Sequence, residues 1–295
     1  MAEEKLRELP GTDSIRLLQR VLMEEVDEII ILSLDFGYSA HEGNKITQIG
    51  ISTMSTNVWR ELSPTEDARI IHSRCVRTPI KSLITSNFLF GESETVYRRN
   101  LVDFLRDALA QRSVDGSPQR VVLVGVGTLN ELKILKDLGI DLQEKSFFAI
   151  EGILDLNAIT KTLELPFRNR PSLLRILKHL EIFFREEYLH DSGNDAHFTL
   201  RALLMLAAIA FERIGGDEVM RSRVESLKTI ALDLIDFSLD MPDEMKRQRR
   251  DQHAGKAAEA RSRLSPVTGS NGGWLGGDDE EVCLASTLLG VQDLM

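Results

Sequence analysis

The chain has 295 residues, of which 42% are hydrophobic and 28% charged, and its formal net charge is −10. This length allows one sizeable core with appendages, and the acidic balance excludes a chain-wide basic footprint, so a nucleic-acid contact has to be local or metal-mediated. The chain has no apolar run of about eighteen residues and no apolar region of a secretion signal. Its two distant cysteines, Cys75 and Cys283, give neither a disulfide framework nor a zinc site. We therefore expect a protein of the cytoplasm or nucleus.

Hydrophobic periodicity predicts alternating strands and helices along the chain. Residues 29–34 and 121–124 are continuous apolar runs, which are typical of strands buried on both faces of a sheet. The other predicted strands are residues 46–53, 68–76 and 146–156. Helical spacing predicts helices over residues 13–28, 93–110, 128–138, 156–163, 172–180 and 195–211. This order predicts an α/β fold, with a five-stranded mixed sheet flanked by helices.

Composition divides the chain into four parts. Residues 1–28 form an N-terminal helical segment, and residues 29–215 form the α/β domain, which ends at the helix-terminating pair Gly215-Gly216. Residues 216–264 are a charged helical extension with a basic cluster at residues 246–250. Residues 265–295 are rich in Gly, Ser and Asp, and we expect them to be disordered with a short apolar end.

A polar loop runs from His190 to Asp195, and a strongly apolar helix follows at once. The apolar spacing buries one face of that helix, so Asp195 stands in its first turn and is anchored by the core. Such a carboxylate can ligate a metal, and the nearby His190 can move protons. The alternative is that Asp191, Ser192 and Asp195 only cap the helix and complement its dipole.

Two further carboxylates stand at the ends of predicted elements. Asp35 directly follows the apolar strand 29–34, where a charge is costly unless it is paired, hydrated or bound to a cation. Glu131 lies in the first turn of the helix after strand 121–124. For Glu131 the alternative is a capping box, in which Thr128 caps the helix and Glu131 reaches back. Adjacent strand and helix ends can bring Asp35 and Asp195 together.

These residues resemble the motifs of the DEDD superfamily of ribonuclease H-like 3′–5′ exonucleases, in the subclass with a catalytic histidine. His190 and Asp195 fit the family's His-x4-Asp motif, and residues 124–135 around Glu131 fit its second motif. Ser33-Leu34-Asp35-Phe36-Gly37 corresponds to the first motif, and the strand containing Ile49-Gly50-Ile51 matches the family's second strand. The resemblance covers residues 29–213. It is greatest to a fungal branch of exonuclease-like proteins, related to yeast proteins named for supporting full DEAD-box helicase activity.

The resemblance implies two divalent ions, Mg²⁺ or Mn²⁺, about 4 Å apart, which clamp the scissile phosphate and activate a water molecule. It assigns Asp35 to bridging both ions, Asp195 to the first ion and Glu131 to the second. It assigns His190 to the base that takes the proton of the water. The resemblance therefore makes His190, Asp35 and Asp195 the expected catalytic residues.

Two positions depart from the family pattern. Gly37 stands where the family has a glutamate and offers no ligand, and Glu131 stands in place of an aspartate. Glu42 and Asp155 are candidates to replace the missing carboxylate. We therefore expect a nucleic-acid-binding relative with weakened or lost hydrolysis; if it is active, it is a divalent-metal-dependent 3′–5′ exonuclease. The alternative is a non-enzymatic interaction module in RNA metabolism, acting through its cleft or its basic C-terminal segment.

Basic residues precede the loop that contains His190. Arg168, Arg170 and Lys178 are candidates to line the same cleft and bind phosphates, which so acidic a chain would otherwise repel. An ordinary exposed helix face is the alternative. The expected partner is single-stranded nucleic acid, RNA rather than DNA, with a protein partner through the C-terminal tail and no membrane.

Overall fold

The structure is a computed structural model that describes residues 14–23, 28–39, 45–57, 70–79, 87–113 and 116–233. Glu42, the basic cluster at residues 246–250 and the expected disordered tail lie outside the described residues. The strands are β1 (Ile29–Ser39), β2 (Lys45–Ser55), β3 (His72–Arg77), β4 (Ser93–Thr95), β5 (Arg120–Gly125) and β6 (Ala149–Asp155). The α-helices are α2 (Ser14–Met23), α4 (Leu101–Ala110), α5 (Leu129–Asp137), α6 (Leu156–Thr162), α7 (Leu173–His179), α8 (Ser192–Ile214) and α9 (Glu218–Leu232). Two 3₁₀ turns are η2 (Arg98–Asn100) and η3 (Glu186–Tyr188).

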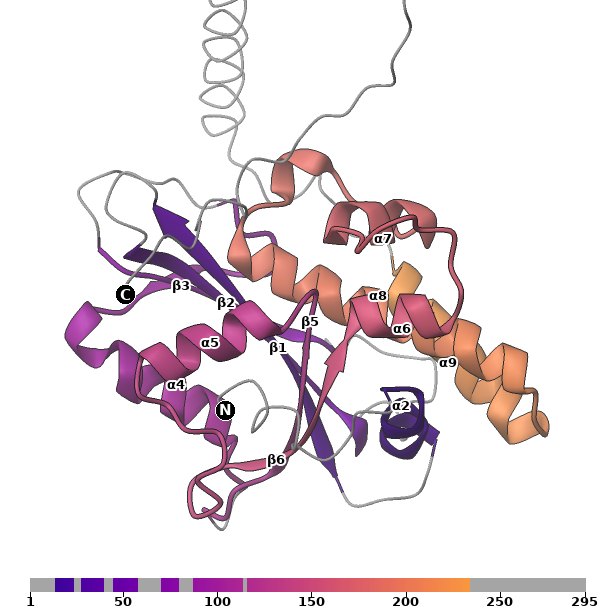
Figure 1. The fold of residues 1–295 in the computed structure, drawn as a ribbon, viewed down its shortest axis with the longest axis horizontal. Coiled ribbons are helices and arrows are strands. Elements are labelled where there is room, and N and C mark those ends of the chain that lie inside the picture. The colour runs from indigo at the N-terminus through magenta and orange to yellow at the C-terminus, as the bar shows by residue number, and fades with distance from the viewer. Residues whose placement is uncertain are drawn as a thin grey trace, which may run out of the picture. The chain divides into compact units, whose positions relative to one another are not determined.

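The described strands form one six-stranded sheet in the order β4-β3-β2-β1-β5-β6 (Figure 1). β1 pairs antiparallel with β2 and parallel with β5, and it therefore lies inside the sheet. β2 and β3 are antiparallel, whereas β5 and β6 are parallel. The predicted α/β class, a mixed sheet with flanking helices, is confirmed.

The sheet has one strand more than the five expected. β4 pairs parallel with β3, although the sequence predicted a helix from residue 93, and α4 begins only at Leu101. β4 is three polar residues long and has no apolar alternation that would mark it as a strand. The guanidinium of Arg74 on β3 donates two hydrogen bonds of 2.8 Å to the carboxylate of Glu94. Contacts with a strand distant in sequence thus define β4.

Successive residues of β1 point to opposite faces of the sheet. Ile29 and Ile31 lie in the core that contains α8, together with α2, α6 and α9. Ile30, Leu32 and Leu34 lie in the second core, which α4 and α5 cover (Figure 1). The same alternation directs residues 33, 35 and 37 toward the α8 face.

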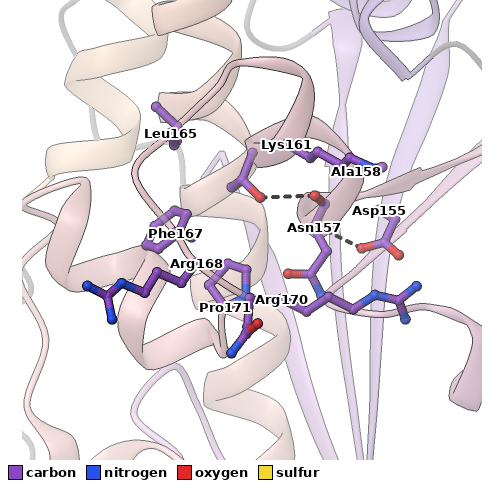
Figure 2. A pocket seen from close by; sticks show the side chains of 11 residues that line it. Asp155, Asn157, Ala158, Lys161, Leu165, Phe167, Arg168, Arg170 and Pro171 are labelled. Atoms are coloured by element: carbon purple, nitrogen blue, oxygen red, sulfur yellow. Dashed lines mark hydrogen bonds between the residues drawn. The ribbon is translucent and has the colours of Figure 1, made fainter. Parts of the chain in front are cut away.

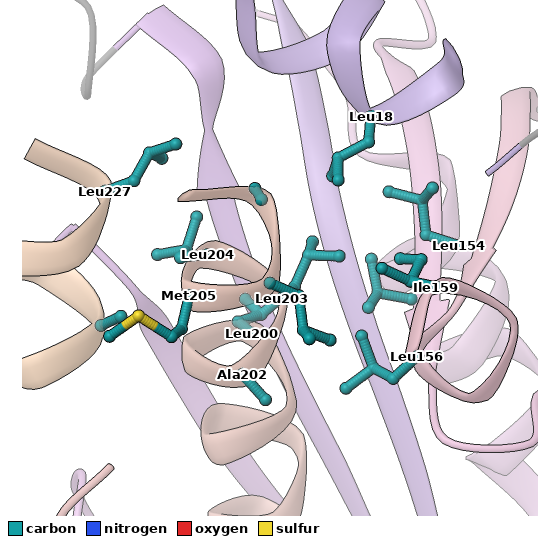
Figure 3. Packing of buried hydrophobic residues seen from close by; sticks show 14 of the residues in the cluster. Leu18, Leu154, Leu156, Ile159, Leu200, Ala202, Leu203, Leu204, Met205 and Leu227 are labelled. Atoms are coloured by element: carbon teal, nitrogen blue, oxygen red, sulfur yellow. The ribbon is translucent and has the colours of Figure 1, made fainter. Parts of the chain in front are cut away.

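Helix α8 is buried over nearly its whole length and on all sides. Leu200 and Leu203 point toward α6, where Ile159 packs, and Leu227 of α9 packs on the opposite side of the helix (Figure 3). The guanidinium Nε of buried Arg201 donates to the backbone carbonyl of Ala231 at 2.8 Å. In the described ranges, no helix combines the length and apolar character that crossing a membrane requires. Packing on all sides holds the first turn of α8 in a defined place.

Two glycines allow that first turn to lie directly against the sheet. A Cβ atom at Gly50 of β2 would lie 1.7 Å from the carbonyl oxygen of Ser192. A Cβ atom at Gly193 would lie 2.6 Å from the ring of Phe88 and 2.7 Å from Cβ of Cys75. Neither position has room for a side chain. The first turn of α8 and the middle of β2 therefore contact each other through their backbones.

Candidate functional site

Asp35 and Asp195 approach each other from β1 and α8. Burial, and then the charge of Asp35, raise the pKa of Asp195 well above its usual range. Burial raises the pKa of Asp35 to about 6, against the hydrogen bond from the Ser192 hydroxyl, and the charge of Asp191 raises it as well. The structure thus brings together two acids that are far apart in the sequence, in an arrangement that disfavours two negative charges.

Glu131 joins this pair from the first turn of α5. Burial raises its pKa to about 7, and the charges of Asp35 and Asp155 raise it as well. The carboxylate oxygen Oε2 is buried and has no hydrogen-bond partner in the described structure. We call Asp35, Glu131 and Asp195 the acid cluster. Each of its three members has a neighbouring carboxylate that disfavours its ionised form.

The structure contradicts the capping-box alternative for Glu131, because Thr128 does not cap the helix. Thr128 has helical backbone angles (φ −52°, ψ −13°), and its side chain makes no capping hydrogen bond. A capping residue has extended backbone angles and accepts a hydrogen bond from the helix. The motif therefore matches by composition without forming the motif's hydrogen bonds.

His190 lies beside the acid cluster at the end of the loop before α8. Its backbone N–H donates to both carboxylate oxygens of Asp195, at 3.3 and 3.1 Å. Its φ of +67° is in the left-handed region, and its side chain is exposed. The charge of His190 lowers the pKa of Asp35, which places the imidazole in reach of the cluster. The backbone turn at His190 thus aligns the two residues of the His-x4-Asp motif.

Tyr38, which the sequence analysis did not single out, also borders the cluster. The side chain is 44% exposed, and burial, followed by the charges of Glu131 and Asp35, raises the pKa of its phenol. The phenol therefore stays protonated and is a hydrogen-bond donor at the edge of the acids. Its position directly after Gly37 at the strand end was the available signal.

The space beside Gly37 is occupied by protein. A Cβ atom at this position would lie 3.1 Å from the Ser192 hydroxyl and 3.2 Å from Cβ of Gln48. The same Ser192 hydroxyl donates to the Asp35 carboxylate. The amide oxygen of Gln48 accepts the backbone N–H of Ser192 at 3.4 Å. A side chain at position 37 would thus press on two neighbouring side chains, each of which would have to move by a few tenths of an ångström.

Among the described residues, the set of ligands for a pair of divalent ions is incomplete. Gly37 supplies no oxygen, and the direction in which a replacement would point is filled by Ser192 and Gln48. Asp155 is not a free substitute, because its Oδ1 atom accepts the backbone N–H groups of Gly127 at 3.0 Å and Asn157 at 2.9 Å. Within the described ranges, no three His, Cys, Asp or Glu side chains are arranged to hold one metal ion. The acid cluster thus offers three carboxylates at positions that match the family's motifs, and the described residues supply no replacement for the fourth.

Asp191 is the N-cap of α8, as the alternative interpretation of this loop predicted. Its Oδ1 atom accepts the N–H of Gly193 at 3.2 Å and the thiol of Cys75 at 3.5 Å. Its Oδ2 atom accepts Nε2 of Gln48 at 3.2 Å and the N–H of Asn87 at 3.1 Å. Asp191 is therefore a buried acid with a hydrogen-bond donor on every side, in contrast to the acid cluster.

Arg168 and Arg170 line a pocket of about 620 Å³ next to Asp155 (Figure 2). Lys178 does not line it; its ammonium group forms a 2.6 Å ion pair with Glu186, and both side chains are exposed. The structure thus brings Arg168 and Arg170 together and gives Lys178 a separate partner. The three residues were predicted as one phosphate-binding set.

The mixed sheet, the helix α8 across it and the acids that converge from β1, α5 and α8 define a ribonuclease H-like protein of the exonuclease type. The family model described as DNA polymerase III subunit epsilon-like, C-terminal domain, matches residues 30–206, which is more than half of the chain. The chain belongs to this DEDDh family of exonuclease-like proteins, whose members generally use divalent metal ions. A comparison with curated proteins found no match.

Proposed function

We propose that this protein binds single-stranded nucleic acid through its ribonuclease H-like domain, and that its two-metal hydrolysis of phosphodiesters is weakened or lost. The observation that carries the proposal is the filled space at Gly37. A relative that hydrolyses phosphodiesters needs a carboxylate there, whereas here the Ser192 hydroxyl lies 3.1 Å from the place of Cβ and donates to Asp35. A hydroxyl bound to Asp35 satisfies part of the coordination that an ion would otherwise satisfy.

The proposal also draws on the other residues that match the family's motifs. Asp35, Glu131 and Asp195 would be the metal ligands of an active relative, and His190 its base. The raised pKa values of Asp35 and Glu131, about 6 and about 7, come from burial and from neighbouring carboxylates. The pKa values also mean that the cluster is partly protonated near neutral pH, which lessens its repulsion of a phosphate.

Basic residues are the proposed contacts for the strand. Arg168 and Arg170 are exposed and line the pocket beside Asp155, whose charge reaches Glu131. Lys178 is the weakest of the three candidates, because Glu186 already offsets its charge. RNA is the proposed strand rather than DNA, and support comes from the resemblance to the fungal branch related to yeast proteins that assist DEAD-box helicases. That resemblance also supports a protein partner for the C-terminal tail.

The test uses the full chain and a 3′-labelled single-stranded RNA. Nucleotide release in Mn²⁺ is measured beside Asp195→Ala, and RNA affinity is measured by fluorescence anisotropy over a range of salt concentrations. We expect release no greater than that of Asp195→Ala, together with salt-dependent binding of the RNA.

Two outcomes would contradict the proposal. Robust release that Asp195→Ala abolishes would mean that another residue replaces the missing glutamate and that hydrolysis is intact. Absence of RNA and DNA binding at low salt would favour the non-enzymatic interaction module, acting through its cleft or its C-terminal segment on a protein partner.

A further inference from the structure

The pocket beside Asp155 is built by the end of β6, by α6 and by the segment 165–171 that follows α6 (Figure 2). Its volume of about 620 Å³ is in the range of small-ligand sites. The residues that give it chemical character are Asp155, Asn157, Lys161, Phe167, Arg168 and Arg170. The pocket is therefore polar and basic on one part of its wall and aromatic on another.

Three cations face this pocket against one carboxylate. Lys161, Arg168 and Arg170 are exposed, and in the part of the chain that the structure describes no carboxylate forms an ion pair with any of them. The two arginines leave the segment in opposite directions, with Arg170 on the side of Asp155 (Figure 2). Asp155 itself is engaged by the backbone N–H groups of Gly127 and Asn157. In an acidic chain, this local excess of positive charge suits a phosphate.

The pocket also offers a hydrogen-bond acceptor that lacks a donor. The side-chain oxygen of Asn157 is buried and has no partner within the described structure. A buried acceptor without a donor costs free energy, and a ligand with an N–H or O–H group would satisfy it. Free phosphate at neutral pH carries few such donors, whereas a nucleobase amine and a sugar hydroxyl each provide one. A ligand that satisfies this acceptor therefore carries an N–H or O–H donor in addition to its negative charge.

The aromatic part of the wall is Phe167, whose ring is partly buried. The ring contacts His179 of α7 in an edge-to-face arrangement, with ring centroids 5.1 Å apart and an interplanar angle of 68°. This contact steadies the ring, and a steadied aromatic ring is a stacking surface for a base. A nucleotide carries the three groups that these features would bind, which are a phosphate, a base that can stack and an N–H or O–H donor.

We propose that this pocket binds one nucleotide unit, with the phosphate attracted by the positive charge of Arg168, Arg170 and Lys161, the base against Phe167, and a base or sugar donor at Asn157. The proposal deepens the proposed function and rests on it in one respect: the strand bound near the acid cluster supplies the nucleotide. Asp155 connects the two places, because it lines the pocket and binds the N–H of Gly127, just before α5 and Glu131. A free nucleoside monophosphate carries the same groups and is the second source of this chemistry.

The experiment measures binding of adenosine monophosphate, adenosine and inorganic phosphate to the full chain by isothermal titration calorimetry, and binding of a short single-stranded RNA by anisotropy. The pocket variants are Arg168→Ala/Arg170→Ala and Asn157→Ala. The matched control is Lys145→Ala/Arg175→Ala, which removes the same charge at two exposed residues outside the pocket. Circular dichroism and thermal melting show that each variant is folded.

We expect adenosine monophosphate to bind more tightly than adenosine or phosphate. We expect the double arginine variant to weaken that binding about tenfold or more, which corresponds to the loss of charge-assisted hydrogen bonds. Asn157→Ala should weaken nucleotide binding and leave phosphate binding unchanged. The control variant should keep the affinity of the natural chain.

The two proposals fail in different ways. Binding of adenosine monophosphate that is absent, or that the pocket variants leave unchanged, overturns the nucleotide site. RNA binding that persists in those variants leaves the proposed function standing and rules out the pocket as its contact. Binding of adenosine monophosphate without any RNA binding supports the pocket as a site for free nucleotides and contradicts the proposed function.

Discussion

Asp191 and Asp195 stand one turn apart at the beginning of α8, and their surroundings differ in kind. The carboxylate of Asp191 accepts hydrogen bonds from Gln48, Cys75, Asn87 and Gly193 and holds the loop to the sheet. Among the described residues, the carboxylate of Asp195 accepts a hydrogen bond only from the backbone N–H of His190, and it faces Asp35. Burial alone therefore does not distinguish a structural acid from a reactive one; the supply of donors does.

The same contrast extends to the neighbours of the two acids. Asn194, next to Asp195, bonds the carbonyl oxygens of Asn87 at 2.9 Å and Tyr188 at 2.8 Å, and it accepts the N–H of Leu89 at 2.9 Å. These bonds and those of Asp191 fasten the segment after residue 86 to α8. In the acid cluster, Glu131 has a buried oxygen with no partner in the described structure. The hydrogen bonds of Asp191 and Asn194 thus stabilise this end of α8, whereas the repulsion between the carboxylates of the acid cluster destabilises it.

The largest expected effect separates the two aspartates by one chemical change. Asp191→Asn should lower the free energy of unfolding by about 4 kcal/mol. The new N–H₂ group is a donor, and it would face buried donors that now bond the carboxylate, so those donors would lose their acceptor. Asp195→Asn should leave stability equal or higher at pH 7.5, because it removes a charge that Asp35 repels. Urea unfolding of both variants in a chelator measures the difference. Equal losses would show that both acids are structural.

The second prediction concerns the pH dependence of Glu131. Its pKa is about 7 in the folded chain against an ordinary 4.5, so its stabilising contribution is fully present below pH 4.5 and is lost as the pH rises through 7. Glu131→Gln should therefore be more stable than the natural chain by about 3 kcal/mol at pH 8 and lose that advantage toward pH 4.5. Thermal melting of both chains across this pH range, in a chelator, measures the effect. A constant difference would mean that Glu131 does not titrate in this window.

The smallest change in the free energy of unfolding is expected for a substitution at Gly37, which lies next to Ser192 and Gln48. The φ of Gly37 is not in the left-handed region, so a side chain is excluded by its neighbours and not by the backbone. Gly37→Ala should cost about 1 kcal/mol, because Gln48 is fixed in β2 and Ser192 would have to leave Asp35. The cost should shrink in a Ser192→Ala background, which a double-mutant cycle in urea measures. A gain in stability on Gly37→Ala would show that the space is open and that Gly37→Glu can rebuild the ligand.

The sequence was sufficient to locate the two apolar strands in the middle of the sheet. The apolar runs of β1 and β5 are readable because a strand buried on both faces excludes polar residues. The predicted bounds of β5 are within one residue of the observed ones, whereas β1 continues past residue 34 to Ser39, so Asp35 lies inside the strand and not after it. The His190–Asp195 spacing, with an apolar helix after it, located the first turn of α8. β4 was missed because three polar residues at a sheet edge carry no periodic signal, and their pairing with β3 is a long-range contact. The capping box at Thr128 was one of two alternatives that the sequence left open, and it does not form, because it needs backbone angles that the sequence does not specify.

By itself, the sequence determined the α/β class, the order of the elements and the identity of the acids, since these depend on local periodicity and on motif spacing. Only the tertiary structure decided which acid is structural. Asp191 and Asp195 are the same residue type on the same turn, and the donors that separate them come from Gln48, Cys75 and Asn87, all more than 100 residues away along the chain. The meaning of Gly37 was decided in the same way, because Ser192 and Gln48 reach it from another helix and another strand. Hydrogen bonding and steric exclusion act over a few ångströms in space, and residues that meet at that distance are unrelated in sequence until the chain has folded.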